Sequence, residues 1–308
     1  MTTNWTENNI PDLRGKTAVI TGANSGLGYE TARALAAKGA AVILACRNLD
    51  KGQQAVAAIQ QHTPHATLEL MPLNLADLSD VRRFAHAYAQ KFDQLHLLIN
   101  NAGVMATPYR ETADGFEMQF GTNHLGHFAL TGHLLPLLLA TPTARVVTVS
   151  SNLHKQGQIN FADINGRKSY APFPAYNQSK LANLLFAYEL QRKLESHGHT
   201  TRSVAAHPGY AATNLQFASE TRVPAWLMRL GNRLMAQDQA MGALPQLYAA
   251  TADDVQGGDY FGPNGRYEIR GYPTKTHSST ASHDREAAAK LWELSEEMTG
   301  VVYPLDTL

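Results

Sequence analysis

The segment TAVITGANSGLG, residues 17–28, decides the fold class. Its first five residues are β-branched or apolar and predict a strand over 17–21, and a helical pattern follows at 27–38. The glycines between them have a G-x-x-x-G-x-G spacing. Glycine permits a tight turn and close ligand approach, and the positive end of a helix favours a pyrophosphate. A turn without ligand is the alternative, but the placement predicts a dinucleotide site formed by Gly22, Asn24, Ser25, Gly26, Leu27 and Gly28.

Short strands continue to alternate with helix-length segments along the rest of the chain. The next strand is predicted at 41–45, and further apolar runs stand at 95–100, 145–150 and 202–206. Parallel strands need right-handed helical crossovers of this length. We therefore expect one domain over residues 1–308, a doubly wound three-layer α/β sheet of the Rossmann type.

Several smaller segments are placed within this single domain. Gly39 and Gly198 follow helical patterns and suit the left-handed position at a helix end. The Gly/Pro-rich stretch 257–271 predicts ordered loops with one late strand. Four further segments are expected: a polar leader over 1–14, an active-site insertion over 152–175, a substrate flap over 214–240 and a closing helix over 283–299.

The composition excludes several classes of function. Lys and Arg number 26 and Asp and Glu number 26, so no overall field recruits nucleic acid or an anionic membrane surface. Cys46 is the single cysteine, which excludes an intrachain disulfide and fits a cytoplasmic protein. Two histidine pairs have i, i+3 spacing, but neither lies in an H-E-x-x-H motif or a carboxylate cluster, so we expect no metal: His62 with His65 and His124 with His127.

The chain also shows no signal for export or for crossing a membrane. Its first fifteen residues hold no apolar core, and no stretch approaches the roughly eighteen apolar residues of a spanning helix. The apolar run at 134–139 is short and contains Pro136, which predicts a helix end or a bend in the core.

Arg47 follows the second predicted strand, in the sequence Ala45-Cys46-Arg47-Asn48. An NAD enzyme of this fold usually presents a carboxylate there to the ribose 2′-hydroxyl. A guanidinium offers a 2′-phosphate a charge-assisted fork instead, which favours NADP(H) over NAD(H). An ordinary surface arginine is the alternative.

Tyr176 and Lys180 open a long helical stretch that runs to about Ser196, and their i, i+4 spacing puts them on one helix face. A tyrosine pKa lies near 10, too high for ready proton exchange at neutral pH. An ammonium about 4 Å away contributes roughly 4 kcal/mol at an effective dielectric constant near 20, so we expect a lowered Tyr176 pKa. On its own, such a pair is more often an ordinary surface pair.

Four ordered motifs now resemble the short-chain dehydrogenase/reductase family over residues 14–215. They are T-G-x-x-x-G-x-G at 21–28, N-N-A-G at 100–103, a strand ending in Ser150-Ser151, and Y-x-x-x-K at 176–180. The retinol-dehydrogenase-like branch is suggested by A-C-R at 45–47, N-H-L-G-H-F at 123–128 and S-K-L-A-N at 179–183. The C-terminal third resembles the family more loosely.

The resemblance implies a role for each matching residue. Ser151, rather than Ser150, would hydrogen-bond the substrate oxygen, and Tyr176 would supply or remove its proton. Lys180 would lower the pKa of Tyr176 and hold the nicotinamide ribose, and Asn123 would anchor a water of the proton relay. Asn74 departs from the pattern, because the family commonly has an aspartate there at the adenine, but an asparagine carbonyl can still accept that hydrogen bond. The other residues would also line the dinucleotide: Leu75 at the adenine, Asn101, Ala102 and Gly103 along the adenosine, and Pro208, Gly209 and Thr213 at the carboxamide.

This sequence also departs from the compact members of the family. The insertion 152–175 carries His154, Phe161, Tyr170 and Phe173, which could line the substrate pocket or anchor the loop. The segment after Thr213 is amphipathic and predicts an apolar lid or ordinary packing. The polar leader differs from the apolar anchor of membrane-associated relatives, which argues against a retinoid substrate.

Together these features predict an NADP(H)-dependent oxidoreductase acting on a small-molecule carbonyl or alcohol, with an apolar or aromatic substrate. A C=C reductase of the same family and a non-catalytic dinucleotide sensor are the alternatives. Either a homodimer or a monomer is compatible with the sequence.

Overall fold

A single sheet of eight strands runs through the part of the chain that the structure describes, residues 4–210 and 237–306 of a computed structural model. The strand order is β3-β2-β1-β4-β5-β6-β7-β8. All neighbours pair in parallel except β7 and β8, which are antiparallel. The strands are Thr17–Thr21 (β1), Ala41–Cys46 (β2), Leu68–Pro72 (β3), Leu97–Asn100 (β4), Arg145–Val149 (β5), Arg202–Ala206 (β6), Tyr260–Pro263 (β7) and Pro273–Lys275 (β8).

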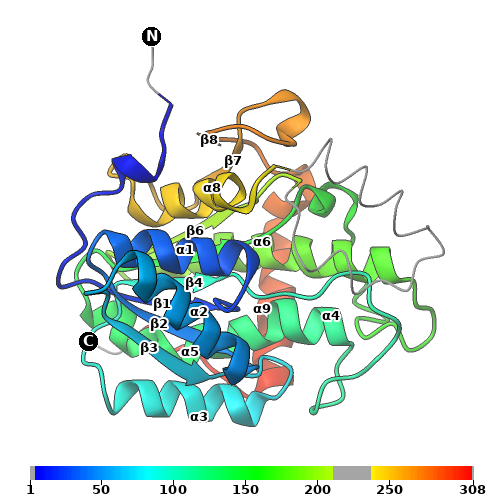
Figure 1. Ribbon diagram of the computed structural model, residues 1–308. Helices are drawn as coiled ribbons and strands as arrows, with labels where there is room; N and C mark the ends of the chain where they lie inside the picture. Colours follow the sequence, from blue (N-terminus) through cyan, green and yellow to red (C-terminus); the bar gives the residue numbers. More distant parts are fainter. Residues whose placement is uncertain (1–3, 211–236, 307–308) are drawn as a thin grey trace.

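Helices cover both faces of this sheet (Figure 1). One core packs α1, α2 and α8 against the sheet, and the other packs α3, α5 and α6, with α9 against α6. Two cores form because alternate residues of a strand face opposite sides of the sheet. In β1, Ala18 and Ile20 belong to the first core and Val19 to the second. The helices are Gly26–Ala37 (α1), Leu49–His62 (α2), Leu78–Ala89 (α3), Met118–Phe120 (α4), Gly126–Ala140 (α5), Pro172–Ser196 (α6), Gln239–Thr251 (α8) and Arg285–Thr299 (α9).

The strand order confirms the predicted doubly wound α/β fold. The chain leaves β1 toward β2 and β3 on one side, then returns to β4 on the other, so the order reverses between β1 and β4. Ligands of open α/β sheets bind outside the carboxyl ends of the strands at such a reversal. The fold therefore directs attention to the loops after β1 and β4.

Two local predictions are corrected by the structure. Pro136 ends no helix, because α5 continues through it to Ala140. Helix α6 begins at Pro172, one turn before Tyr176, since a proline at the first helical positions needs no amide partner. The expected flap 214–240 lies outside the described residues except for its last four, and Thr213 lies outside them too.

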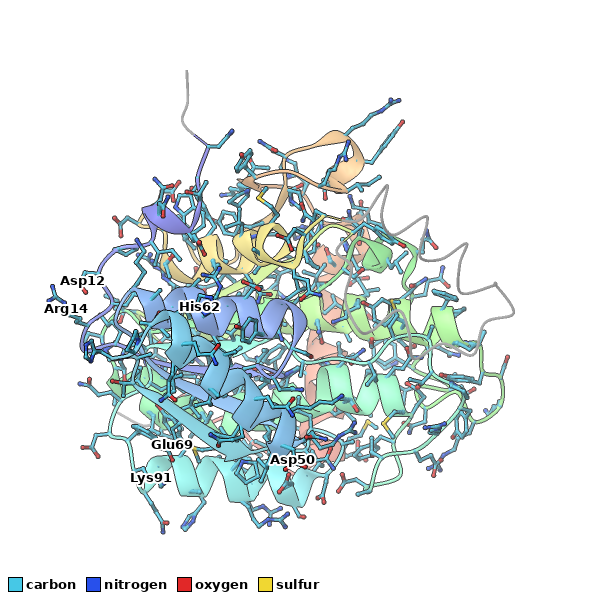
Figure 2. The ribbon with its side chains drawn as sticks, viewed as in Figure 1. Asp12, Arg14, Asp50, His62, Glu69 and Lys91 are labelled. Carbon is cyan, nitrogen blue, oxygen red and sulfur yellow. The ribbon has the colours of Figure 1, made fainter. Side chains whose placement is uncertain are left out.

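The leader packs against the domain. Ile10 and Leu13 are buried in the core beside α1, and the Trp5 ring lies edge-on to Tyr248 of α8 with centroids 5.1 Å apart. Surface ion pairs such as Glu69 with Lys91, labelled in Figure 2, are exposed by contrast. Exposed pairs contribute about 0–1 kcal/mol each, so burial of the two cores is the main source of stability.

Candidate active site

A cleft of about 540 Å³ opens where the strand order reverses. It is lined by the loops that follow β1, β2, β3, β4 and β6, together with the end of β5 and one face of α6. Ser151, Asn123 and Gly209 are not among its lining residues. The predicted residues that do line it are Gly22, Asn24, Ser25, Gly26, Leu27, Gly28, Arg47, Asn74, Leu75, Asn101, Ala102, Gly103, Tyr176, Lys180 and Pro208.

The glycine turn has a backbone that other residues would disturb. Gly22 and Gly26 have φ of 68° and 58°, in the left-handed region that favours glycine. A Cβ on Gly28 would lie 2.4 Å from the carbonyl oxygen of Gly22, so helix α1 could not approach the turn with a side chain there. The first turn of α1 therefore lines the cleft directly, as a pyrophosphate site requires.

Thr21 ties this turn to the loop after β4. Its hydroxyl oxygen accepts hydrogen bonds from the backbone amides of Asn101 and Ala102, both at 2.9 Å. The Asn101 side-chain amide donates in return to the Thr21 carbonyl at 2.8 Å. These hydrogen bonds hold two walls of the cleft together through Thr21. The Thr21 side chain is fully inaccessible to solvent.

The end of the cleft beside β2 and the start of α2 carries exposed positive charge. Arg47 and Lys51 are exposed and both line the cleft, and no Asp or Glu is among the lining residues that the structure describes. Asn48 caps α2 by accepting a hydrogen bond from the Lys51 amide at 2.9 Å, which brings the first turn of α2 to the cleft. Lys51 was not predicted, although its position four residues after Arg47 could have indicated it.

Asn74 lines the cleft, and both its side-chain oxygen and its backbone amide already have hydrogen-bond partners. Its side-chain oxygen accepts from the backbone of Ala76 at 3.3 Å, and its backbone amide donates to Asp80 at 2.5 Å. A carbonyl oxygen can accept a second hydrogen bond. Asn74 is therefore oriented by its neighbours for the role that the resemblance implied.

Tyr176 and Lys180 are buried at the other end, and the predicted direction of the Tyr176 pKa is wrong. Burial raises the pKa of Tyr176 to about 12, opposed only by a hydrogen bond with Ser151. Burial also lowers the pKa of Lys180 to about 8. The Lys180 Nζ lies 5.7 Å from the centre of the Tyr176 ring and donates to the Val149 carbonyl at 3.2 Å. Desolvation of both groups exceeds the Coulomb attraction that the spacing suggested.

The two serines after β5 have different partners. Ser150 is buried, and its hydroxyl donates to the Lys180 carbonyl at 2.8 Å, so it fastens β5 to α6. Ser151 is half-buried and contacts Tyr176. The Ser151 backbone is itself held by His154, whose Nδ1 lies 2.6 Å from the Ser151 carbonyl oxygen. Ser151 is thus the serine that contacts the Tyr176 phenol, whereas Ser150 is the one of the pair among the lining residues of the cleft.

Asn123 lies just behind the cleft wall. Its side chain accepts from the Val104 amide at 2.8 Å and donates to the Val104 carbonyl and the Ser179 hydroxyl, both at 2.9 Å. It occupies a π-helical turn, Gly121–Leu125, a feature often found at functional sites. The side chain holds the loop after β4 against α6, a positioning role that its sequence match did not suggest.

The loop after β6 is supported by a residue that the motifs missed. Glu268, in the loop between β7 and β8, has a carboxylate oxygen 2.9 Å from Nε2 of the buried His207. Since Gly209 donates its amide to the His207 Nδ1 at 3.2 Å, the neutral ring carries its hydrogen on Nε2, the nitrogen next to Glu268. This contact lowers the pKa of Glu268 to about 2. Only the fold brings residues so distant in sequence together.

Most aromatic residues of the insertion anchor it. The Tyr170 hydroxyl donates to the Thr107 carbonyl at 2.6 Å, and Phe161 packs on a core cluster beneath Lys290. His154 is fully buried and accepts from the Ser279 amide at 3.0 Å. Phe173, 47% exposed, is the exception. None of the four lines the cleft.

The described residues contain neither a helix suited to a membrane nor a cluster suited to a metal ion. Within residues 4–210 and 237–306, no helix has both the length and the apolar character needed to cross a membrane. The same residues contain no group of three or more His, Cys, Asp or Glu side chains arranged to hold a metal ion.

Comparisons with known proteins agree with this geometry. The family model described as short chain dehydrogenase matches residues 16–223. The chain is 41% identical to retinol dehydrogenase 12 of Mus musculus over 294 residues, covering 94% of this chain and 88% of that protein. Retinol dehydrogenase 14 of Mus musculus is also 41% identical, over 305 residues, covering 94% and 87%. A solved structure of a protein from Mycobacterium Paratuberculosis has a TM-score of 0.82 at 45% identity, covering 98% of this chain and 100% of that chain.

Proposed function

This chain belongs to the short chain dehydrogenase family, and we propose that it uses NADP(H) to interconvert a carbonyl and an alcohol with Tyr176 as proton donor and acceptor. The family match confirms the resemblance predicted from four motifs, including its retinol-dehydrogenase-like branch. The chain is therefore an oxidoreductase by family, and its cofactor preference, chemistry and substrate are the matters proposed.

The residues present fit a nicotinamide dinucleotide. Gly22 has a left-handed backbone, and Gly28 has no room for a Cβ. Helix α1 begins at the cleft, where its free amides and dipole favour phosphate. Arg47 and Lys51 place two cations at the adenosine end, and none of the lining residues that the structure describes is a carboxylate. An additional 2′-phosphate would be attracted there, which supports NADP(H) over NAD(H).

When bound, the dinucleotide supplies or accepts the hydride at the reacting carbon. Tyr176 is protonated at neutral pH because burial raises its pKa to about 12, so it can donate a proton to the carbonyl oxygen during reduction. Ser151 contacts the phenol and offers a hydroxyl to the same oxygen. Lys180 is the nearby cation, and its charge favours the phenolate left after proton transfer. Burial of Tyr176 and Lys180 excludes water from the exchange.

One observation gives this proposal its main support. A single cleft has the glycine turn, Arg47 and the loop after β4 at one end, and Tyr176 with Lys180 at the other. A non-catalytic sensor would need only the first set of groups. The presence of both along one continuous cleft supports turnover rather than binding alone.

The relatives support an apolar substrate. Both similar mammalian proteins are named for retinol, an apolar primary alcohol. We therefore propose an apolar or aromatic carbonyl, or the corresponding alcohol, as the substrate class. The proposed substrate class includes retinoids, although the polar leader argued against a retinoid substrate.

The test is consumption of NADPH or NADH by the purified chain with a panel of aldehydes and ketones that includes retinal. We expect turnover with apolar carbonyls and a preference for NADPH. NADPH binding measured by fluorescence, without turnover of any panel member, would instead support the sensor. Product analysis is needed as well, because a saturated C–C bond with the carbonyl retained would support the C=C reductase.

A further inference from the structure

Two buried histidines stand three residues apart behind the cleft, and they have different partners. His124 Nε2 lies 2.9 Å from the Ser295 hydroxyl of α9, among aromatic rings. His127 Nε2 lies 2.9 Å from the Thr21 hydroxyl, at the end of β1. Each is about 1% exposed. Of these two histidines, only His127 contacts a residue that lines the cleft, Thr21.

The hydrogen positions on His127 follow from its partners. Its Nδ1 lies 2.9 Å from the backbone carbonyl of Asn123, which can only accept, so Nδ1 carries a hydrogen. Burial lowers the pKa of His127 to about 4, so the ring is neutral at pH 7 and Nε2 has no hydrogen. The Thr21 hydroxyl therefore donates to Nε2, an orientation assigned from the network.

This assignment gives one direction to a series of buried and half-buried hydrogen bonds, in which Asn123 takes part with its backbone carbonyl and, separately, with its side-chain amide. The amides of Asn101 and Ala102 donate to Thr21, and Thr21 donates to His127. His127 donates to the carbonyl of Asn123, whose side-chain amide donates to Ser179 at 2.9 Å. The Ser179 hydroxyl donates to the Tyr176 carbonyl at 2.7 Å.

We propose that His127 is a positioning residue that couples the dinucleotide loops, through Thr21, to the helix that carries Tyr176, through Asn123. The inference deepens the proposed function and rests on it. Hydrogen bonds in a buried chain polarise one another, and such a chain can transmit the ordering of one loop to the next element. His127 is the link that accepts from one wall of the cleft and donates to the other.

Replacement of His127 should therefore affect chemistry more than binding. In His127→Leu the Asn123 carbonyl loses a donor, and the Thr21 hydroxyl keeps only the Ile99 carbonyl, 3.4 Å away, as an acceptor. Tyr176 is then held less firmly while the glycine turn remains. We expect kcat to fall roughly tenfold, because small displacements at a reacting centre reduce rates strongly, with the Kd for NADPH changed less than about threefold. His127→Gln, which keeps a donor and an acceptor, should recover part of the loss.

His124→Leu is the matched control. It removes an equally buried imidazole from the same segment, together with its bond to Ser295. We expect a lower Tm with unchanged kcat. A loss of kcat in His124→Leu as large as in His127→Leu would show that general loosening of this segment is responsible, and would overturn the inference.

A double-mutant cycle with Thr21→Val tests the coupling directly. If His127 acts through Thr21, the double variant should have a kcat within about threefold of Thr21→Val, whereas multiplied losses would overturn the inference. A second readout needs no turnover: the ¹⁵N resonance of His127 Nε2 should shift when NADPH is added to the wild type, and that of His124 should not. NADPH binding without this shift would overturn the coupling. NADPH binding with the shift, but with no substrate turned over, would overturn the proposed function and leave the coupling in place.

Discussion

The two ends of the cleft are built differently. At the adenosine end, Arg47 and Lys51 are exposed and keep their hydration. At the nicotinamide end, Tyr176 and Lys180 are 5% and 4% exposed, and burial moves the pKa of each toward its uncharged form. Exposed charges attract a phosphate without strict geometry, whereas buried groups must be placed exactly where a proton moves.

We expect this difference to separate the residues that select the cofactor from the residues that carry out the reaction. A change at the exposed end should alter which dinucleotide binds and leave the reaction itself intact. A change at the buried end should alter the reaction and leave binding largely intact. The following experiments test that separation.

The largest effect is expected for Tyr176→Phe. Loss of the phenolic proton should lower kcat by at least about 10³-fold, since general acid catalysis typically contributes 10²–10⁴-fold. The Kd for NADPH should remain within a few-fold, because the proton is used in chemistry. Stopped-flow turnover and fluorescence titration measure the two quantities.

Tyr188→Phe is its matched control. Tyr188 is buried on the same helix, and its hydroxyl bonds Ser278 at 2.8 Å, outside the cleft. It should lose stability and keep kcat. Wild-type activity in Tyr176→Phe would end the mechanism proposed here.

A smaller effect, about 10²-fold in the ratio of kcat/KM for NADPH to that for NADH, is expected for Arg47→Asp. The substitution removes a charge-assisted hydrogen bond of about 1.5–3 kcal/mol and adds repulsion toward a 2′-phosphate. Turnover at saturating cofactor should be unchanged. The same substitution at Arg82, an exposed residue of α3 outside the cleft, should leave the ratio unaltered. An unchanged ratio in Arg47→Asp would remove Arg47 from cofactor recognition.

The smallest effect concerns pH. Burial lowers the pKa of Lys180 to about 8, so its ammonium is present below that pH and lost above it. Tyr176 stays protonated to about pH 12 and does not limit reduction in this range. The value of kcat/KM for NADPH, which reports the free enzyme, should therefore fall up to tenfold per pH unit above about 8. In Lys180→Arg any remaining activity should lack this decline; a decline at the same pH in both would assign it to another group.

Local pattern was sufficient for much of the fold. The strands predicted at 17–21 and 202–206 have the observed bounds. For 17–21 the reason is a continuous β-branched and apolar run, which suits a strand buried on both faces. Strand β8, Pro273–Lys275, could not be predicted, since three residues carry no periodicity and their partner β7 lies across a loop. Pro136 misled because it lies on the exposed side of α5, while the buried residues Leu134, Leu135 and Leu138 keep the helix packed on the core.

The residues of the site can be divided in the same way, into those that local motifs indicated and those that they did not. Motif spacing indicated the glycine turn, Arg47, Tyr176 and Lys180, since adjacent loops of a parallel sheet must meet at one edge. It did not indicate Glu268, which reaches His207 from a hairpin some sixty residues later. Contacts of that kind have no local signal.

The sequence by itself determined which chemical groups this protein has and the order in which its strands and helices present them. The tertiary structure alone decided the direction in which the pKa values of those groups shift. It surrounds Tyr176, Lys180 and His127 with segments distant in sequence, and loss of water shifts each pKa toward the uncharged form. The physical reason is that desolvation depends on everything packed around a group, whereas sequence spacing reports only its neighbours along the chain.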